Sequence, residues 1–214
     1  MIPGALALAI SYLSGSIPTA YLAGRVVKGI DLRTVGSGNL GATNVYRTMG
    51  AKVAAVVFVV DVLKGALPVL LLPALVLSPV EMEATNAPLW YGIACGVAAI
   101  LGHAKPVFLM GRGGGKGVAT AAGIFLALAP LPLGIALLAF VLVLWRTGYV
   151  SAASLTAAVV LVASLFALVG WRSPVTLIGV LVCAFVFWSH RANITRLRNG
   201  TEHRFSRSKP TEDA

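Results

Sequence analysis

The chain has 214 residues, of which 58% are hydrophobic and only 11% are charged. Soluble domains carry about 25% charged residues, so a soluble fold of this length could not cover so much apolar surface. The net charge of +10 would indicate nucleic acid for a soluble protein. Here the basic residues lie in short segments beside long apolar runs, which is a membrane-topology signal. Composition therefore argues against a soluble or nucleic-acid-binding protein, and favours anionic lipid headgroups and phosphorylated compounds as partners.

Apolar runs of about 18 or more residues are typical of membrane-spanning helices. We predict an all-α, polytopic membrane helix bundle whose seven spans are 2–24, 52–77, 88–103, 117–129, 131–146, 149–170 and 174–190. The first is a spanning helix and not a signal peptide, because no basic residue precedes Arg25. No internal repeat or linker is visible, so we expect one domain over 1–214 with a short polar tail over 191–214.

The fourth and fifth predicted spans form one apolar stretch, interrupted by the sequence Ala129-Pro130-Leu131-Pro132. Two prolines in this spacing break a helix. Each half is short for a complete span, so the alternative is that one half is re-entrant and buried against protein.

The basic residues sort to one side of the seven-span arrangement. Fifteen of the 17 Lys and Arg residues fall in the segments 25–52, 104–116, 146–148 and 191–214. The opposite loops contain Glu81, Glu83 and a single Arg172. Because cytoplasmic loops are rich in Lys and Arg, we predict an external N-terminus and a cytoplasmic C-terminus, which requires an odd number of spans.

The first cytoplasmic segment is rich in glycine and in polar side chains. Glycine lets backbone N–H groups approach an anion closely, and an arginine adds a fork that matches phosphate. The other interpretation is a flexible loop with a helix cap at Ser37 or Thr43. The residues that we predict to bind substrate in this segment are Ser37, Gly38, Asn39, Gly41, Thr43, Asn44 and Arg47.

A second glycine segment, 111–117, leads directly into an apolar helix and carries Lys116. A glycine loop with a lysine at a helix N-terminus is suited to phosphate, whereas the alternative is a plain cytoplasmic turn. It is not a Walker A loop, because Met110 and Gly117 stand where glycine and Ser or Thr are required. The candidate binding residues here are Gly113, Gly114, Gly115, Lys116, Gly117 and Thr120.

Five further polar residues lie within the apolar runs, at their ends or just beyond them. Asp61 and Lys64 are three residues apart and share a helix face, so we predict a structural ion pair beneath the site. His103 and His190 both end predicted spans on the cytoplasmic side, which is consistent either with a shared site or with interfacial side chains. Asn193 shares a face with His190 if the helix continues.

Metal binding is not expected, because neither His-x-x-His nor Cys-x-x-Cys spacing occurs. Both cysteines, Cys95 and Cys183, lie in apolar runs and are interpreted as buried apolar residues. The sequence also lacks a Gly-x-Ser-x-Gly elbow and a His-x4-Asp signature.

Six motifs recur together in order and resemble one family, the bacterial acyl-phosphate–dependent glycerol-3-phosphate acyltransferases known as PlsY. These motifs are GSIPTAYL (15–22), GSGNLGATNVYR (36–47), DVLKG (61–65), GHAKPVF (102–108), GGKGVAT (114–120) and HRANITRL (190–197). The resemblance extends from the first span to the tail. One departure is the stretch Gly111-Arg112-Gly113, where the family usually has an aromatic and a basic residue before Gly-Gly-Lys-Gly.

The resemblance implies transfer of a fatty acyl group from acyl phosphate to the 1-hydroxyl of sn-glycerol 3-phosphate. The products would be lysophosphatidic acid and phosphate, formed without a cofactor or metal, by a multi-pass enzyme of the bacterial inner membrane that we expect to be a monomer. By resemblance the catalytic residues would be Ser37, Arg47, Lys116, His190 and Asn193. His103 joins the binding residues named above.

The general base is left open. His103 and His190 are candidates, and an oxygen of a substrate phosphate is the alternative. A carrier or channel for a phosphorylated solute is the competing class of function, although transporters commonly show related halves that this chain lacks. A structural scaffold would leave both glycine segments unexplained.

Overall fold

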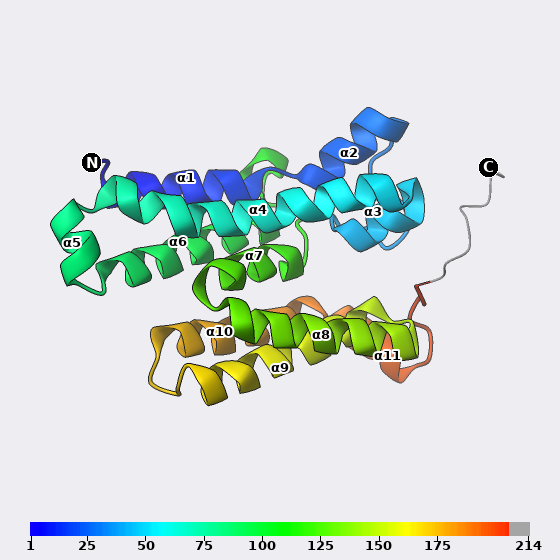
Figure 1. Cartoon of the computed structure of the whole chain (residues 1–214). Helices are drawn as coiled ribbons and strands as arrows, with labels where there is room; N and C mark the ends of the chain where they lie inside the picture. Colours follow the sequence, from blue (N-terminus) through cyan, green and yellow to red (C-terminus); the bar gives the residue numbers. More distant parts are fainter. Residues whose placement is uncertain (206–214) are drawn as a thin grey trace. The chain divides into compact units, whose positions relative to one another are not determined.

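The computed structural model describes residues 1–205, and these contain helices and no strand (Figure 1). Contacts divide the chain into two compact units, Met1–Ala127 and the part that begins at Leu128. The expected single domain over 1–214 stays a prediction.

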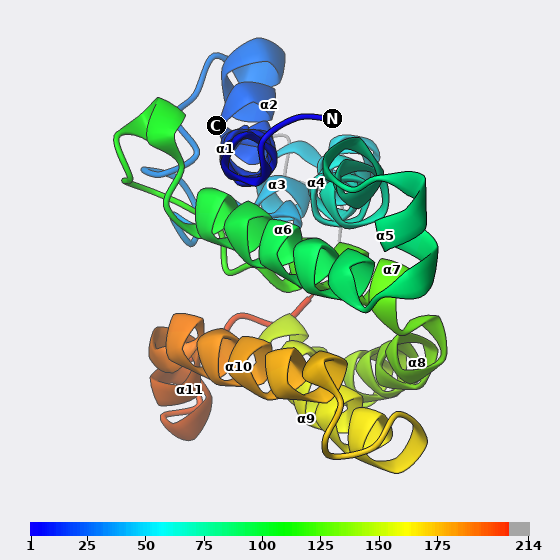
Figure 2. The ribbon, with the colours of Figure 1, turned by 90° about the vertical axis from the view of Figure 1, so that its left-hand side faces the viewer.

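The first unit contains three long helices that pack on one another, α1 (Gly4–Ser16), α4 (Ala51–Val76) and α6 (Ala87–Ala104) (Figure 2). Glycine allows α1 and α6 to approach closely. A methyl group at Gly15 would overlap the backbone of Ala99, and one at Gly102 would overlap the backbone of Tyr12. Small residues at helix contacts are the usual means of close packing within membranes.

Shorter elements complete this unit. They are α2 (Thr19–Lys28), α3 (Ala42–Met49), α5 (Pro79–Ala84), the 3-10 turn η1 (Val107–Leu109) and α7 (Val118–Leu128). The predicted span 2–24 corresponds to the candidate span Gly4–Lys28, but its helix is interrupted, because α1 ends at Ser16 and Pro18 precedes α2. Proline lacks the N–H that would continue the ladder of helical hydrogen bonds.

The second unit is built from α8 (Pro130–Thr147), α9 (Val150–Leu168), α10 (Pro174–Ser189) and α11 (Arg191–Arg198). α9 packs against both α8 and α10. The chain bends by 59° between α10 and α11, so the helix does not continue straight from His190 to Asn193. The predicted break before α8 is confirmed, since α7 ends at Leu128 and Pro130 is the first residue of α8.

Five helical segments in residues 1–205 are long and apolar enough to cross a membrane, and a sixth is obtained if α10 and α11 form one bent span. Seven complete spans are therefore not confirmed. The difference lies at the predicted span 117–129, where α7 has 11 residues. At 1.5 Å per residue it is about 17 Å long, against about 30 Å for a bilayer core. This length suits the re-entrant alternative.

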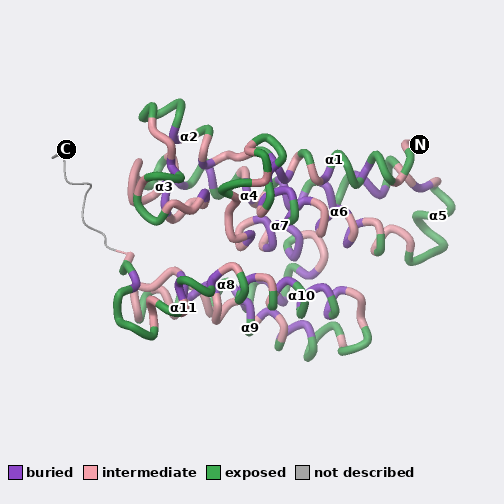
Figure 3. The backbone as a smooth tube through the Cα atoms, turned by 180° about the vertical axis from the view of Figure 1, so that it is seen from behind, coloured by how far each residue is buried: buried purple, intermediate pink, exposed green. Residues whose placement is uncertain are grey.

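Exposed residues occur along all the long helices (Figure 3), and many of them have large apolar side chains. Leu70 and Leu71 on α4 are each 57% exposed, and Leu138 on α8 is 61% exposed. In water such surfaces would be unfavourable, whereas lipid covers them without cost. The same residues that could not be buried in a soluble fold therefore face outward here.

Candidate functional site

The first glycine segment runs between α2 and α3 and is held in place by one buried amide. Asn44 donates from Nδ2 to the carbonyl oxygens of Leu32 at 3.3 Å and Val35 at 3.0 Å, and its Oδ1 accepts from the N–H of Ser37 at 3.0 Å. The predicted ligand Asn44 thus uses its side chain to fix the loop. Ser37 is exposed.

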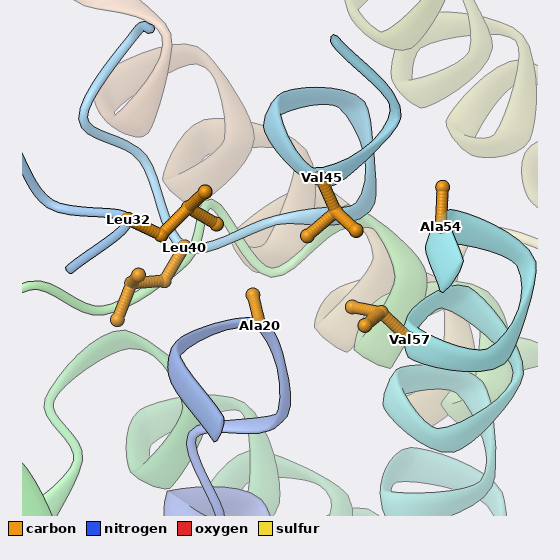
Figure 4. Close-up of a cluster of buried hydrophobic side chains, with 6 residues drawn as sticks. All are labelled: Ala20, Leu32, Leu40, Val45, Ala54 and Val57. Carbon is orange, nitrogen blue, oxygen red and sulfur yellow. The ribbon is translucent and has the colours of Figure 1, made fainter. Parts of the chain in front are cut away.

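A small apolar cluster anchors the same segment. Figure 4 shows Leu32 and Leu40 of the loop beside Val45 of α3, close to residues from α2 and α4. The remaining members of this cluster are Ala20, Ala54 and Val57. Burial of these side chains sets the start of α3, which carries Thr43 and, in its last turn, the half-buried Arg47.

Two arginines and an aspartate lie at the outer side of this segment. Asp31 accepts from Arg33 at 2.7 Å and from Arg25 at 3.4 Å, and both guanidinium groups lie over the ring of Tyr21. Hydrogen bonds from Arg33 lower the pKa of Asp31 to about 2. Gly113 of the second loop packs against the side chain of Arg33, so a basic group that we did not predict adjoins that loop.

The second glycine loop, residues 111–117, lies against the first segment and against the end of α6. A methyl group at Gly115 would overlap the His103 imidazole and would come within 2.8 Å of the Leu40 carbonyl oxygen. One at Gly114 would overlap the backbone of Ala104. The backbone N–H of Gly115 also donates to the His103 carbonyl at 3.2 Å. The two predicted phosphate loops are therefore adjacent, and only glycine fits where they meet.

This loop ends at the first turn of α7. Gly113 and Gly117 adopt positive φ angles of 73° and 78°, a region that disfavours residues with a Cβ atom. The half-buried Lys116 directly precedes Gly117. A lysine at this place, beside backbone N–H groups at a helix N-terminus, is suited to an anion.

A buried ion pair lies beneath the loop, as predicted. Lys64 Nζ is 2.7 Å from Asp61 Oδ1, and it also donates to the carbonyl oxygen of Ile17 at 3.2 Å, where α1 gives way to α2. His103 Nδ1 is 3.9 Å from Asp61 Oδ1. All three side chains are at most 7% exposed.

A cavity of about 10 Å³ is lined by these three groups and by the loop residues 113–115. A space of that size holds about one water molecule, so it is part of the packing beneath the loop. Thr120, a predicted ligand, is buried with its hydroxyl unpaired among the described residues.

In the second unit, His190 lies at the junction of α10 and α11. Its Nδ1 is 2.8 Å from the carbonyl oxygen of Val186 and 3.3 Å from Ser189 Oγ. A carbonyl oxygen only accepts hydrogen bonds, so the neutral ring carries its proton on Nδ1 and has Nε2 as its basic nitrogen.

Asn193 is held by a carboxylate that our sequence reasoning missed. Glu202 Oε1 accepts from Asn193 Nδ2 at 2.7 Å and from Ser151 Oγ at 2.9 Å, while Oε2 accepts from Arg196 Nε at 2.7 Å. Burial by itself raises the pKa of Glu202, but these hydrogen bonds outweigh burial and lower it. The only sequence signal was a single acidic residue just after a basic helix.

The first unit therefore brings together both glycine segments, His103 and the pair beneath them, while His190 and Asn193 belong to the second unit. Asn39 and Gly41 contact each other in the first segment, where Gly38 lies close to the Arg33 carbonyl. The roles of these residues in binding stay predictions.

Comparison with known proteins covers both units. The sequence profile of the family described as glycerol-3-phosphate acyltransferase matches residues 5–200. Proteins named glycerol-3-phosphate acyltransferase are similar over almost the whole chain. The protein from Geotalea daltonii is 46% identical, covering 92% of this chain and 95% of its own, and that from Trichlorobacter lovleyi is 47% identical, covering 96% and 99%.

Solved structures agree with this result. The fold resembles the crystal structure of PlsY, an integral membrane glycerol 3-phosphate acyltransferase, in its glycerol 3-phosphate form, with a TM-score of 0.83, 37% identity and coverage of 95% and 96% of the two chains. The lysophosphatidic acid form gives a TM-score of 0.80, with 35% identity and 95% of each chain covered. The chain is thus an integral membrane protein, and it belongs to the glycerol-3-phosphate acyltransferase family.

Proposed function

We propose that this protein transfers a fatty acyl group from acyl phosphate to the 1-hydroxyl of sn-glycerol 3-phosphate. The observation that carries this proposal is the contact of the two glycine segments at Gly115, Leu40 and His103. Two adjacent glycine loops, one followed by Arg47 on α3 and the other containing Lys116 just before α7, are suited to two phosphate groups that would otherwise repel each other. An acyl phosphate and glycerol 3-phosphate present such a pair.

The chemistry needs no covalent enzyme intermediate, because acyl phosphate is already an activated anhydride. The hydroxyl oxygen attacks the acyl carbonyl carbon, an ester bond forms, and the bond between that carbon and the phosphate oxygen breaks. The hydroxyl proton passes to an oxygen of a substrate phosphate. The contribution of the protein is then alignment of the substrates and stabilisation of the leaving phosphate.

We assign residues to these tasks as follows. Arg47 and Ser37 hold glycerol 3-phosphate, Lys116 contacts a phosphate, and the backbone of 113–117 with Asn39 and Thr43 surrounds the head of acyl phosphate. His190 and Asn193 are also assigned to the catalytic residues. Asn44 acts indirectly, because its amide fixes the loop that presents Ser37.

For the acyl chain we assign an apolar groove between α2 and α4. It has a volume of about 450 Å³ and is lined by aliphatic side chains that include Leu22, Val26 and Val56. Thr19 lines both this groove and the small cavity beneath the second glycine loop. An acyl chain in this groove would therefore begin beside the glycine loops and extend along a surface that faces lipid.

The reaction is tested with purified protein supplied with acyl phosphate, with and without glycerol 3-phosphate. We expect phosphate release and lysophosphatidic acid only when both are present, and no effect of EDTA. The Lys116→Ala variant is the control for spontaneous hydrolysis. If acyl-CoA is a good donor and acyl phosphate is not, the donor assignment is wrong.

We also propose that the N-terminus is external and that both glycine loops face the cytoplasm of a bacterial inner membrane. The support is the sorting of basic residues along the sequence. Single cysteines at the exposed positions 37, 112 and 198 should be protected from impermeant reagents in intact cells, and one at 82 should be labelled, on a background that lacks Cys95 and Cys183. Position 115 is unsuitable for a labelled cysteine, because a side chain there would overlap the His103 side chain. Labelling of 112 from outside would overturn this orientation.

A further inference from the structure

The stretch of α4 from Asp61 to Gly65 contacts the elements on both sides of the second glycine loop. On the side that precedes the loop, Asp61 lies 3.9 Å from His103 Nδ1, and the other edge of that imidazole lies against Gly115. The loop thus rests on a histidine whose opposite face meets the Asp61–Lys64 pair. Lys64 in turn is tied to the Ile17 carbonyl.

On the side that follows the loop, the same stretch of α4 meets α7. A methyl group at Gly65 would overlap the carbonyl oxygen of Thr120, and one at Gly123 would overlap that of Val62. The backbones of α4 and α7 therefore touch directly. Since α7 begins one residue after Gly117, this contact fixes the end of the loop.

We propose that Asp61 and Lys64 are positioning residues for the second glycine loop, acting through His103, so that the loop is held in the geometry that binds phosphate. Neither residue needs to touch substrate, because both lie beneath the loop, across a cavity of about 10 Å³. This inference rests on the proposed function only in naming glycerol 3-phosphate as the ligand whose binding the loop geometry controls.

Burial makes a merely structural role the competing explanation, and the two roles predict different behaviour. Removing one member of a buried pair leaves an unpaired charge, but replacing both by apolar residues of similar volume is often neutral for folding. The double variant Asp61→Leu/Lys64→Met should therefore fold like the unmodified protein. If the pair also positions His103, the same variant should release the loop.

The experiment compares this double variant with Lys64→Met alone and with Thr176→Val. Thr176 is a matched control, because it is buried in α10 and donates a hydrogen bond to Gly170 at 2.7 Å but has no role in the loop. We measure folded yield, KM for glycerol 3-phosphate, and trypsin cleavage after Arg112 and Lys116, with cleavage after the exposed Arg198 as an internal reference.

We expect low folded yield for Lys64→Met and normal yield for the double variant. The double variant should show a KM raised by about tenfold or more, which corresponds to loss of one charge-assisted contact, and faster cleavage in the loop only. Thr176→Val should change neither KM nor loop cleavage. Normal yield, normal KM and normal cleavage in the double variant would show that the pair is structural only.

If the double variant does not fold, Asp61→Asn/Lys64→Met is the deciding variant, because it removes both charges, leaves no unpaired charge buried and keeps the size of the Asp61 side chain. For this variant we expect the same rise in KM and the same faster cleavage in the loop. Failure of both to fold would also overturn the proposal, since the pair would then be a requirement of the fold. Trypsin cleavage needs no turnover, so it tests the positioning role even if acyl phosphate proves not to be the donor.

Discussion

Asn193 donates a 2.7 Å hydrogen bond from Nδ2 to Oε1 of Glu202, and both side chains are buried. An asparagine amide can rotate to suit several partners, but a carboxylate only accepts. Glu202 therefore fixes the orientation of the Asn193 amide. The NH2 group faces Glu202, and the carbonyl oxygen of that side chain points away from it. The predicted catalytic residue is held by a residue nine positions further along the chain, four positions beyond the end of α11 at Arg198, and that residue also accepts from Ser151 and Arg196.

The first prediction separates positioning from stability at Glu202. Glu202→Gln retains an oxygen that accepts from Asn193 and Ser151 but loses the ion pair with Arg196, so we expect nearly normal kcat and a lower melting temperature. Glu202→Ala leaves buried donors unpaired, and it should cost roughly 2 kcal/mol or more of stability and lower kcat as well. Activity and thermal unfolding in detergent measure the two effects. Equal kcat for both variants would show that Asn193 needs no such partner.

The second prediction concerns pH. Hydrogen bonds hold the pKa of Glu202 below its usual value, so its contribution to stability is complete above the unfolded pKa, about 4.3, and is lost as pH falls through the lower folded pKa. The difference in melting temperature between the unmodified protein and Glu202→Gln should be constant near neutral pH and should shrink in acid. A difference that grew in acid would contradict the assignment.

The third prediction concerns the two basic residues of the loops. Arg47→Ala and Lys116→Ala each remove a charge-assisted hydrogen bond to phosphate, worth roughly 1.5–3 kcal/mol, or about a 10- to 150-fold loss in kcat/KM. Arg47→Lys should also be impaired, because a point charge does not replace the fork.

Arg198→Ala is the control for these variants, since Arg198 is exposed. Arg207 and Lys209, for which we also expect almost no effect, lie outside the described residues. Full activity of both loop variants together with loss in Arg198→Ala would move the binding surface to the C-terminal segment.

The fourth prediction concerns the acyl-chain groove. Val56 lines it and is 62% exposed, so Val56→Trp should fill the groove without disturbing the core. We expect slower transfer from palmitoyl phosphate and little change with octanoyl phosphate. Val141→Trp is the control, because Val141 on α8 is 58% exposed and lies outside the groove. If activity falls with both donors, or if the preference between them does not change, the acyl chain binds elsewhere.

Hydrophobicity predicted most of the fold, and the exceptions have identifiable physical reasons. The predicted span 149–170 corresponds to α9, Val150–Leu168, because an uninterrupted apolar run leaves few alternatives in a membrane. The break at Pro18 was missed, since apolar residues continue on both sides of it and hydropathy does not register a lost hydrogen bond.

The site was predictable only where spacing fixes geometry. Asp61 and Lys64 pair as expected because three residues along a helix bring side chains together. Asn44 was predicted to bind substrate, and the sequence could not show that its amide is directed to backbone groups of the first segment. Glu202 was missed because its partners, Ser151 among them, are brought near it only by folding.

The last prediction compares two glycines on consecutive helices, α7 and α8. Gly123 on α7 lies where a methyl group would overlap the Val62 carbonyl of α4, whereas Gly134 on α8 has nothing within 4 Å. Alanine is the better helix former by about 1 kcal/mol, so Gly134→Ala should be neutral or slightly stabilising. Gly123→Ala should instead push α7 from α4, lower the melting temperature and raise KM for glycerol 3-phosphate, because α7 carries the end of the loop. If both alanine variants behave alike in thermal unfolding and in kinetics, α4 does not support the phosphate loop through this contact.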